Sequence, residues 1–291
     1  MTHDSSADGS LLTVRGLQVA YRGRTFRPPT RVLHGVDLDV RAGEAVGLVG
    51  ESGSGKSTLG RAVLGLAPVT GGSIVFDGED ISHASRARRR ALAADIQVIF
   101  QDPYSSLSPS LTVGDTLSEP LRARGGTRGD SLRRVSELLD LVNLPADAAR
   151  RLPREFSGGQ RQRIAIARAL ALEPRLIICD EPVSALDLTT QERILDLLLE
   201  VQERTGVAYL FVSHDLNVVR AVCHRVAVMR GGEIVESSDG DAVTSAPAHP
   251  YTQRLLLAAP VADPVQQARR RQEYALVRDQ DASLENLEDN R

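Results

Sequence analysis

The octapeptide GESGSGKS at residues 50–57 limits the folds open to this chain because of where it occurs. It follows a short apolar run, 45–49, and precedes a stretch in which Leu59, Ala62, Val63 and Leu66 recur at helical spacing. A glycine-rich turn between a strand and a helix can wrap its N–H groups around phosphate oxygens, and the helix start adds partial positive charge. The pattern therefore predicts a phosphate-binding loop, with an ordinary flexible glycine loop as the alternative.

Side chains of this loop have distinct expected roles. Lys56 is the only lysine among 35 basic residues, and its compact ammonium can reach the β- and γ-phosphates as a point charge. The Ser57 hydroxyl is expected to bind Mg²⁺, which prefers oxygen ligands. The residues predicted to contact the nucleotide are Gly50, Ser52, Gly53, Ser54, Gly55, Lys56, Ser57 and Thr58.

Two carboxylates, Asp180 and Glu181, end the apolar run that starts at Leu176. Adjacent acids on a buried strand are costly unless a cation or hydrogen bonds compensate. We therefore expect Asp180 to lie in the Mg²⁺ shell and Glu181 to act as general base on the attacking water. The alternative is a pair of acids that simply faces solvent at the strand end.

A second glycine-containing helix start occurs at residues 157–160, SGGQ, before the helical stretch 161–172. Ser157 and Gln160 have the spacing of a capping box, which explains these two residues. A cap does not explain Gly158 and Gly159, which weaken a first turn but leave bare N–H groups to face an anion. The sequence therefore predicts a dimer in which this helix start closes over the nucleotide of the other chain.

Composition fits a globular protein of one large domain or two small ones. The 291 residues are 42% hydrophobic and 25% charged, and the net charge of -3 argues against a dedicated nucleic-acid binder. Two cysteines, Cys179 and Cys223, exclude a disulfide scaffold. No apolar run approaches the roughly 20 residues of a membrane span, and the polar start lacks signal-peptide features. We expect a cytoplasmic protein that, if it works at a membrane, depends on other chains for the pore.

Strands alternating with helices predict an α/β fold with a mainly parallel sheet. Residues 1–10 are expected to form a disordered leader, 102–165 a helical insert, and 261–291 a polar tail. Strands are predicted at 11–21, 36–40, 45–49, 74–76, 96–100, 176–179, 207–212, 226–229 and 234–235. Helices are predicted after the loop, at 82–94, at 131–144 with Leu132 on its apolar face, at 161–172 and around 194–201.

The order of these motifs resembles the ATP-binding subunit of ABC transporters over about residues 11–260. The resemblance is carried by GESGSGKST (50–58), Gln101, FSGGQRQR (156–163), LIICDEP (176–182), SALD (184–187) and His214. It implies a P-loop ABC ATPase domain with a mainly parallel core sheet, an antiparallel β subdomain and a helical subdomain. It also implies ATP and Mg²⁺ as cofactors and ATP hydrolysis as the activity.

Roles for further residues follow from that resemblance. Residues 157–161 would contact the γ-phosphate of the partner's ATP, and Asp187 would lie at the dimer seam. Gln101 would touch Mg²⁺ or the attacking water, and His214 the γ-phosphate and water; outside this ordered set, each would be an ordinary polar residue after a strand. Tyr21 is similar to the aromatic residue that stacks on adenine, with Phe26 as its nearest rival.

A finer resemblance is to oligopeptide and dipeptide importers, carried by VIFQDPYSSLSPSLTV (98–113) and HPYTQ (249–253). The segment 48–66 is similar to the second, or F, ATPase subunit of that branch. The branch implies a second ATPase subunit, identical or different, two transmembrane permease subunits and an extracytoplasmic solute-binding protein. Peptides are the expected solute, with nickel or glutathione as alternatives.

Three smaller expectations complete this interpretation. Some ATPases of the branch hold an iron–sulfur cluster near the C-terminus, and none is predicted here because no cysteine follows Cys223. Residues 104–110 would either receive a membrane subunit or form a plain surface loop. The arginines at 86 and 88–90 favour a solvated helix face over a membrane-facing patch.

Two other classes remain as alternatives. An ABC ATPase acting on DNA or ribosomes usually has a long coiled coil or two cassettes, and the chain between Lys56 and Ser157 has no room for such a coil. A simple P-loop kinase or switch would need no Ser157–Gln160 site.

Overall fold

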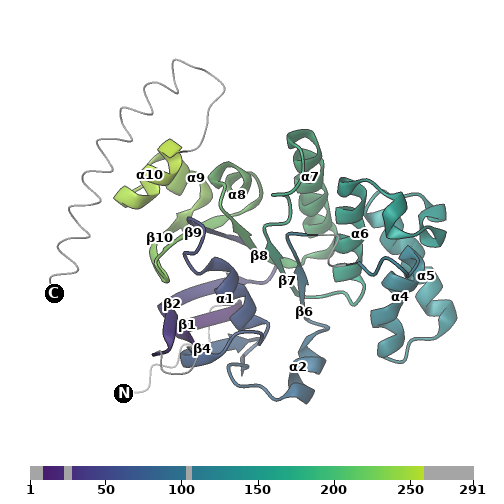
Figure 1. Ribbon diagram of the computed structural model, residues 1–291, viewed down its shortest axis with the longest axis horizontal. Helices are drawn as coiled ribbons and strands as arrows, with labels where there is room; N and C mark the ends of the chain where they lie inside the picture. Colours follow the sequence, from purple (N-terminus) through teal and green to yellow (C-terminus); the bar gives the residue numbers. More distant parts are fainter. Residues whose placement is uncertain (1–8, 23–27, 103–106, 259–291) are drawn as a thin grey trace.

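The computed structural model describes residues 9–22, 28–102 and 107–258. Two sheets form one end of the molecule and a group of helices forms the other (Figure 1). The predicted leader at 1–10 falls outside these residues except for residues 9 and 10, and the predicted tail at 261–291 falls outside entirely. Phe26 and Tyr104 also lie outside the described residues.

The larger sheet has six strands in the order β10-β9-β3-β8-β7-β6, and all neighbours are parallel except β10 and β9. The strands are β3 (Ala45–Val49), β6 (Ile96–Ile99), β7 (Leu176–Asp180), β8 (Ala208–Ser213), β9 (Arg225–Arg230) and β10 (Glu233–Asp239). Side chains along each central strand alternate between two cores: Ile178 belongs to one and Cys179 to the other. Burial on both faces explains why these strands read as unbroken apolar runs.

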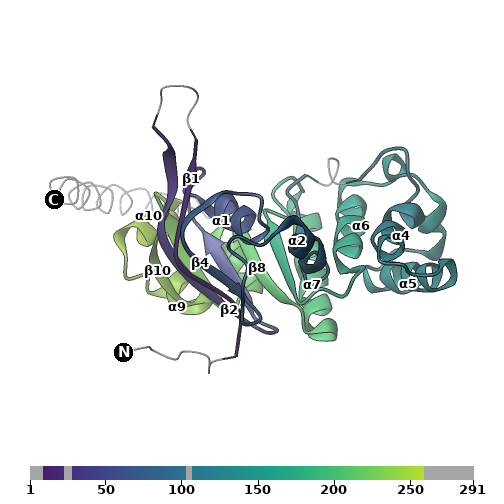
Figure 2. The ribbon, with the colours of Figure 1, turned by 90° about the horizontal axis from the view of Figure 1, so that it is seen from below.

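The smaller sheet is antiparallel, in the order β2-β1-β4-β5, and confirms the predicted antiparallel part of the fold. Its strands are β1 (Ser10–Tyr21), β2 (Thr30–Arg41), β4 (Val69–Phe76) and β5 (Glu79–Asp80). The far ends of β1 and β2 project from the body of the molecule (Figure 2). The strand predicted at 74–76 is longer in the structure, since β4 also runs through Gly71 and Gly72. A Cβ on Gly72 would lie 2.3 Å from the Gly16 carbonyl oxygen, so the glycine allows β1 to pass closely at an irregular register.

Helices and turns alone make up the described residues between 113 and 170. They are α4 (Val113–Ala123), α5 (Arg128–Leu141), two 3₁₀ turns at Ala146–Arg150 and Pro153–Glu155, and α6 (Gly158–Leu170). α6 lies between the other helices of this group and the large sheet (Figure 1). The remaining helices are α1 (Lys56–Val63), α2 (Arg86–Leu92), α7 (Leu188–Thr205), α8 (Leu216–Val222), α9 (Gly240–Ser245) and α10 (Pro250–Ala258). In the described ranges, no helix is both long and apolar enough to cross a bilayer.

Three predictions about helix faces differ from the structure. Leu66 is 65% exposed because α1 ends before Gly65, whose φ of +73° turns the chain away. Leu132 is 61% exposed, and the inner face of α5 is formed by Val135, Leu138 and Leu139. The expected solvated arginine face of α2 is only partly right. Arg88 pairs with Glu79, but the guanidinium of Arg89 is half-buried and donates to the carbonyls of Val63 and Ile81.

Candidate functional site

The predicted phosphate-binding loop joins β3 to α1 at the carboxyl edge of the large sheet. A Cβ on Gly50 would lie 2.1 Å from the Met229 carbonyl oxygen, so no larger residue fits there. Gly55 has a φ of +108° and begins α1 without a side-chain cap. The first N–H groups of α1 are therefore left without a side-chain acceptor, as an anion site requires.

Lys56 is 5% exposed and its ammonium lies inside the loop. Nζ donates to the carbonyl oxygens of Gly50 and Glu51, both at 2.8 Å, and to Ser54 Oγ at 3.4 Å. Burial lowers the pKa of Lys56, while the nearby carboxylates of Glu181, Asp180 and Glu51 oppose that shift. The loop thus holds one desolvated cation where the predicted phosphates would lie.

Ser57 and Asp180 meet beside this loop. Ser57 Oγ, in the first turn of α1, donates to Asp180 Oδ1 at the end of β7 over 2.8 Å. A hydroxyl and a carboxylate fit the oxygen preference of Mg²⁺. The described residues contain no cluster of three or more His, Cys, Asp or Glu side chains that could hold a metal ion. Gln101 lies exposed just after β6, which neighbours β7 at the same sheet edge.

Glu181 and His214 follow the neighbouring strands β7 and β8, and their side chains come together. Glu181 Oε2 lies 3.3 Å from His214 Nδ1. Glu181 has a φ of +50°, a left-handed conformation that costs roughly 1–2 kcal/mol for a residue with a Cβ. Its N–H donates to the Val212 carbonyl, and its own carbonyl accepts from Ser184 Oγ. The backbone therefore fixes an acid and an imidazole side by side.

The helix start at 157–160 forms the predicted capping box. Ser157 Oγ accepts from the Gln160 N–H at 3.3 Å, and Gln160 Oε1 accepts from the Ser157 N–H at 3.0 Å. Packing within the chain supplies a further reason for Gly159. A Cβ there would lie 2.4 Å from Thr190 Cγ2, so close packing of α6 on α7 accounts for it. A Cβ on Gly158 would make only an ordinary 3.5 Å contact with Leu186, so packing within the chain does not require this glycine.

Asp187 and Tyr21 lie on separate elements. Asp187 caps α7, accepting from the Thr190 N–H at 3.0 Å and the Thr190 hydroxyl at 2.7 Å, and these bonds lower its pKa. Thr190 therefore joins the starts of α6 and α7. Tyr21 ends β1 opposite Thr30 and is 37% exposed, so its ring is open to solvent.

Residues in the C-terminal part of the described chain also contact the phosphate-binding loop. The Tyr251 hydroxyl accepts from the Glu51 N–H at 3.0 Å, and Arg254 lies 3.2 Å from the Glu51 carboxylate. The Gly232 N–H donates to the Ser54 carbonyl at 2.9 Å. Sequence reasoning missed these contacts, although it singled out HPYTQ as a motif.

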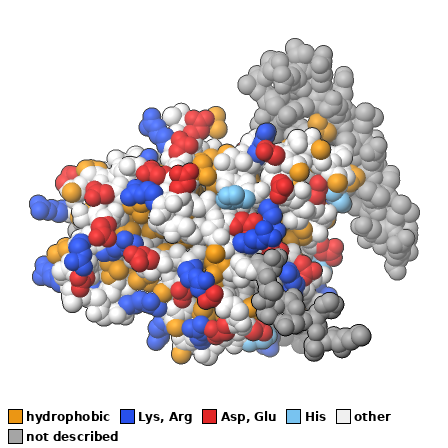
Figure 3. All heavy atoms as spheres, turned by 180° about the vertical axis from the view of Figure 1, so that it is seen from behind, with side chains coloured by type: hydrophobic (Ala, Val, Ile, Leu, Met, Phe, Trp, Pro, Cys, Tyr) orange, Lys and Arg blue, Asp and Glu red, His pale blue; other side chains and the backbone are white. Residues whose placement is uncertain are grey.

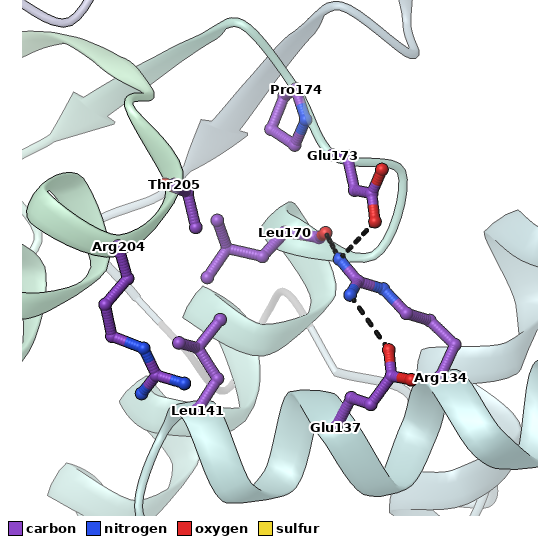
Figure 4. A pocket seen from close by; sticks show the side chains of 8 residues that line it. All are labelled: Arg134, Glu137, Leu141, Leu170, Glu173, Pro174, Arg204 and Thr205. Carbon is purple, nitrogen blue, oxygen red and sulfur yellow. Dashed lines mark hydrogen bonds and ion pairs between the residues drawn. The ribbon is translucent and has the colours of Figure 1, made fainter.

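The described residues also line several cavities away from this loop. A groove of about 680 Å³ lies between α2, β6, α4 and α6, and the exposed ring of Phe100, next to Gln101, lines it. A second cavity of about 360 Å³ is lined by residues of α5, α6 and α7 and the turn between α6 and β7 (Figure 4). There, Arg134 contacts Glu137 at 3.2 Å and Glu173 at 3.3 Å. The residues labelled in Figure 4 include none of the predicted site residues.

Known proteins are similar to this chain in both sequence and fold. The profile of the ABC transporter family matches residues 33–184. The glutathione import ATP-binding protein GsiA of Salmonella paratyphi A is 50% identical over 275 residues, which cover 92% of this chain and 44% of GsiA. This chain thus spans less than half of that relative.

Solved structures agree with this relationship. The structure of cbiO1 from Clostridium perfringens, part of the ABC transporter complex cbiONQ, has a TM-score of 0.74 at 28% identity, covering 82% of this chain and 92% of cbiO1. The dimeric ATP-binding cassette MJ0796, in a post-hydrolysis state bound to ADP and Pi, has a TM-score of 0.70 at 31% identity, covering 78% and 98%. The predicted α/β fold with a mainly parallel core sheet is confirmed, and the chain belongs to the ABC transporter family.

Proposed function

We propose that this chain binds ATP and Mg²⁺ at residues 50–58 and hydrolyses the ATP to power an importer. The observation that carries the proposal is the convergence of two pairs, Ser57 with Asp180 and Glu181 with His214, beside the buried Lys56. Each pair joins neighbouring elements at one sheet edge, which is where α/β folds bind ligands.

In the proposed reaction, water attacks the γ-phosphorus in line as the bond to the bridging oxygen breaks and ADP leaves, while this chain orients the reactants. The N–H groups of the loop and of α1 bind the phosphate oxygens, and Lys56 Nζ exchanges its carbonyl partners for the β- and γ-phosphates. Ser57 and Asp180 would hold Mg²⁺, which neutralises charge on the phosphates. Glu181 accepts the proton from water, His214 holds the γ-phosphate and Glu181 in place, and Gln101 orients the water.

The proposal includes a second ATPase subunit, identical or different. Ser157, Gly158, Gly159, Gln160 and Asp187 would face the nucleotide bound by that partner. The dimeric state described for MJ0796 supports this arrangement, and so does Gly158, whose bare backbone the chain's own packing does not require. Tyr21 would stack on the adenine from the exposed end of β1.

At the cytoplasmic face of the membrane, one of two permease subunits would bind the groove beside Gln101. Phe100 and Pro120 give that groove apolar surface, and Arg168 and Glu119 give it polar edges. An extracytoplasmic solute-binding protein would deliver the solute. Basic and acidic side chains are interspersed on the face drawn in Figure 3, unlike the uniformly basic surface of a nucleic-acid binder. The cassette would extend over about residues 11–260, with a helical subdomain at 102–165 and a C-terminal segment at 231–260.

Peptides are the proposed solute. The 50% identity to a protein named for glutathione import favours glutathione, itself a small peptide, over the nickel alternative. The test is uptake by proteoliposomes that contain the permease subunits, this chain and its partner ATPase, with the solute-binding protein added outside. We expect ATP-dependent entry of labelled peptide or glutathione. Solute entry that is unchanged when this chain carries Lys56→Ala would contradict the proposal. ATP turnover without entry of either solute would also contradict it.

A further inference from the structure

The HPYTQ segment at 249–253 starts α10, and several polar contacts fix its position. The Glu236 carboxylate, on β10, accepts from the N–H groups of Ala248 at 2.8 Å and His249 at 3.0 Å. The Tyr251 N–H donates to His249 Nδ1 at 3.0 Å, and Gln253 Nε2 donates to the Pro247 carbonyl. The first turn of α10 is thus held against the large sheet by Glu236, and the side chains of His249 and Gln253 fix its local geometry.

This anchoring places Tyr251 under the phosphate-binding loop. Tyr251 is 1% exposed, and its ring lies 5.1 Å from the Arg230 guanidinium and 5.2 Å from that of Arg254. Its hydroxyl accepts the Glu51 N–H. A buried ring with this packing has one available position, so the hydroxyl marks a fixed point for the loop backbone.

Glu51 connects that fixed point to Lys56. Its N–H donates to Tyr251, its carboxylate pairs with Arg254, and its carbonyl accepts from Lys56 Nζ at 2.8 Å. Because one peptide unit follows the other, the contacts from α10 determine where the carbonyl that holds the ammonium lies.

We propose that Tyr251 is a positioning residue that holds the phosphate-binding loop in its binding conformation before nucleotide arrives. The inference rests on the proposed binding of ATP in this loop. Removing the acceptor leaves the Glu51 N–H unpaired, so the loop rearranges to satisfy it and nucleotide must reorder the loop on binding. Arg254 adds a smaller contribution, since Glu51 is largely exposed at that contact.

The test compares Tyr251→Phe with Tyr209→Phe in the full chain. Tyr209 is also buried, and Tyr209→Phe also removes one hydrogen bond, which the hydroxyl donates to the Leu198 carbonyl. Tyr209 lies near the start of β8, whereas the phosphate-binding loop lies at the end where the strands of the large sheet finish. Hydrogen–deuterium exchange of peptides covering 48–56 is measured without nucleotide, and the Kd for Mg·ATP by titration. We expect Tyr251→Phe to speed exchange in the loop and to weaken ATP binding about three- to tenfold. We expect Tyr209→Phe to leave both unchanged while lowering stability.

Loop exchange and Kd equal to wild type in Tyr251→Phe would overturn the inference, and Lys56-dependent binding in the wild type would still support the proposed function. If the wild type fails to bind ATP, the proposed function falls, and loop exchange without nucleotide still decides whether Tyr251 holds the loop. Should Tyr251→Phe not fold, Arg254→Gln is compared with Arg254→Lys. Faster loop exchange in the first alone supports the contact from α10, and equal exchange in both overturns it.

Discussion

The carboxylate of Glu181 lies 3.3 Å from Nδ1 of His214, across the ends of two neighbouring parallel strands. The left-handed backbone at Glu181 directs it there at a cost that an ordinary strand end would avoid. A solvent-facing acid pair would not need this conformation. The two adjacent carboxylates therefore have different partners: Glu181 lies beside an imidazole, and Asp180 accepts from the Ser57 hydroxyl.

Glu181→Gln should retain ATP binding and lose most turnover. The amide keeps the shape of the side chain but cannot accept a proton, so phosphate release should fall about 10²- to 10⁴-fold. The two measurements are phosphate release by the assembled transporter and binding of labelled ATP. Turnover at the wild-type rate would remove Glu181 as the base.

Lys56→Ala should weaken ATP binding. Loss of a desolvated cation and its hydrogen bonds to phosphate corresponds to about 10- to 100-fold in Kd. Titration with a labelled ATP analogue measures it. Arg61→Ala, an exposed cation on the same helix, is the matched control and should bind as wild type. Equal affinity in both variants would exclude the assigned role of Lys56.

Gly158→Ala and Gly159→Ala should fail in different ways. Gly159→Ala forces a Cβ onto the Thr190 methyl and should lower the free energy of unfolding by about 1–3 kcal/mol. Thr190→Ser removes that methyl, keeps the hydroxyl that bonds Asp187, and should restore stability to Gly159→Ala.

Gly158→Ala should instead fold normally, since its Cβ would meet Leu186 only at an ordinary 3.5 Å, and should impair ATP-dependent dimer formation if the proposed partner's nucleotide needs the bare backbone there. Urea unfolding and size-exclusion chromatography with ATP separate the two effects. Normal dimer formation by Gly158→Ala would contradict the proposed partner site.

Docking of α10 should weaken in acid. Burial raises the pKa of Glu236, but the N–H groups of Ala248 and His249, which donate to its carboxylate, oppose that shift, and the net pKa is lowered from 4.5. A carboxyl with a lowered folded-state pKa stabilises above its unfolded value, and that stability is lost as pH falls through the folded value. The stability difference between wild type and Glu236→Gln should therefore shrink below about pH 4.5. A difference in urea midpoints that is independent of pH would contradict this.

Local patterns predicted the elements that local physics specifies. The phosphate-binding loop, the capping box at Ser157 and the central strands follow from glycine placement, side-chain spacing and apolar runs. α4 went unpredicted because Pro120 and the surrounding Gly and Ser residues obscure its period, although Thr112 caps its start. Leu66 was misplaced because spacing continues past the glycine that ends α1.

Tertiary contacts were out of reach of the sequence. Thr190 explains Gly159 only once α6 and α7 are packed. The Glu51–Tyr251 hydrogen bond joins residues 200 positions apart, and no periodicity or spacing rule links them. Such contacts depend on the completed fold. Nothing in the local sequence of HPYTQ indicates that its tyrosine contacts the phosphate-binding loop.

That separation also sets an order of events during synthesis. A ribosome adding about 5–20 residues per second makes Tyr251 roughly 10–40 s after Glu51. Until then, the loop lacks its acceptor from α10 and the Gly232 contact. Until residue 251 has been synthesised, the phosphate-binding loop of the nascent chain lacks this acceptor, and we expect it to bind nucleotide less tightly than the loop of the folded chain.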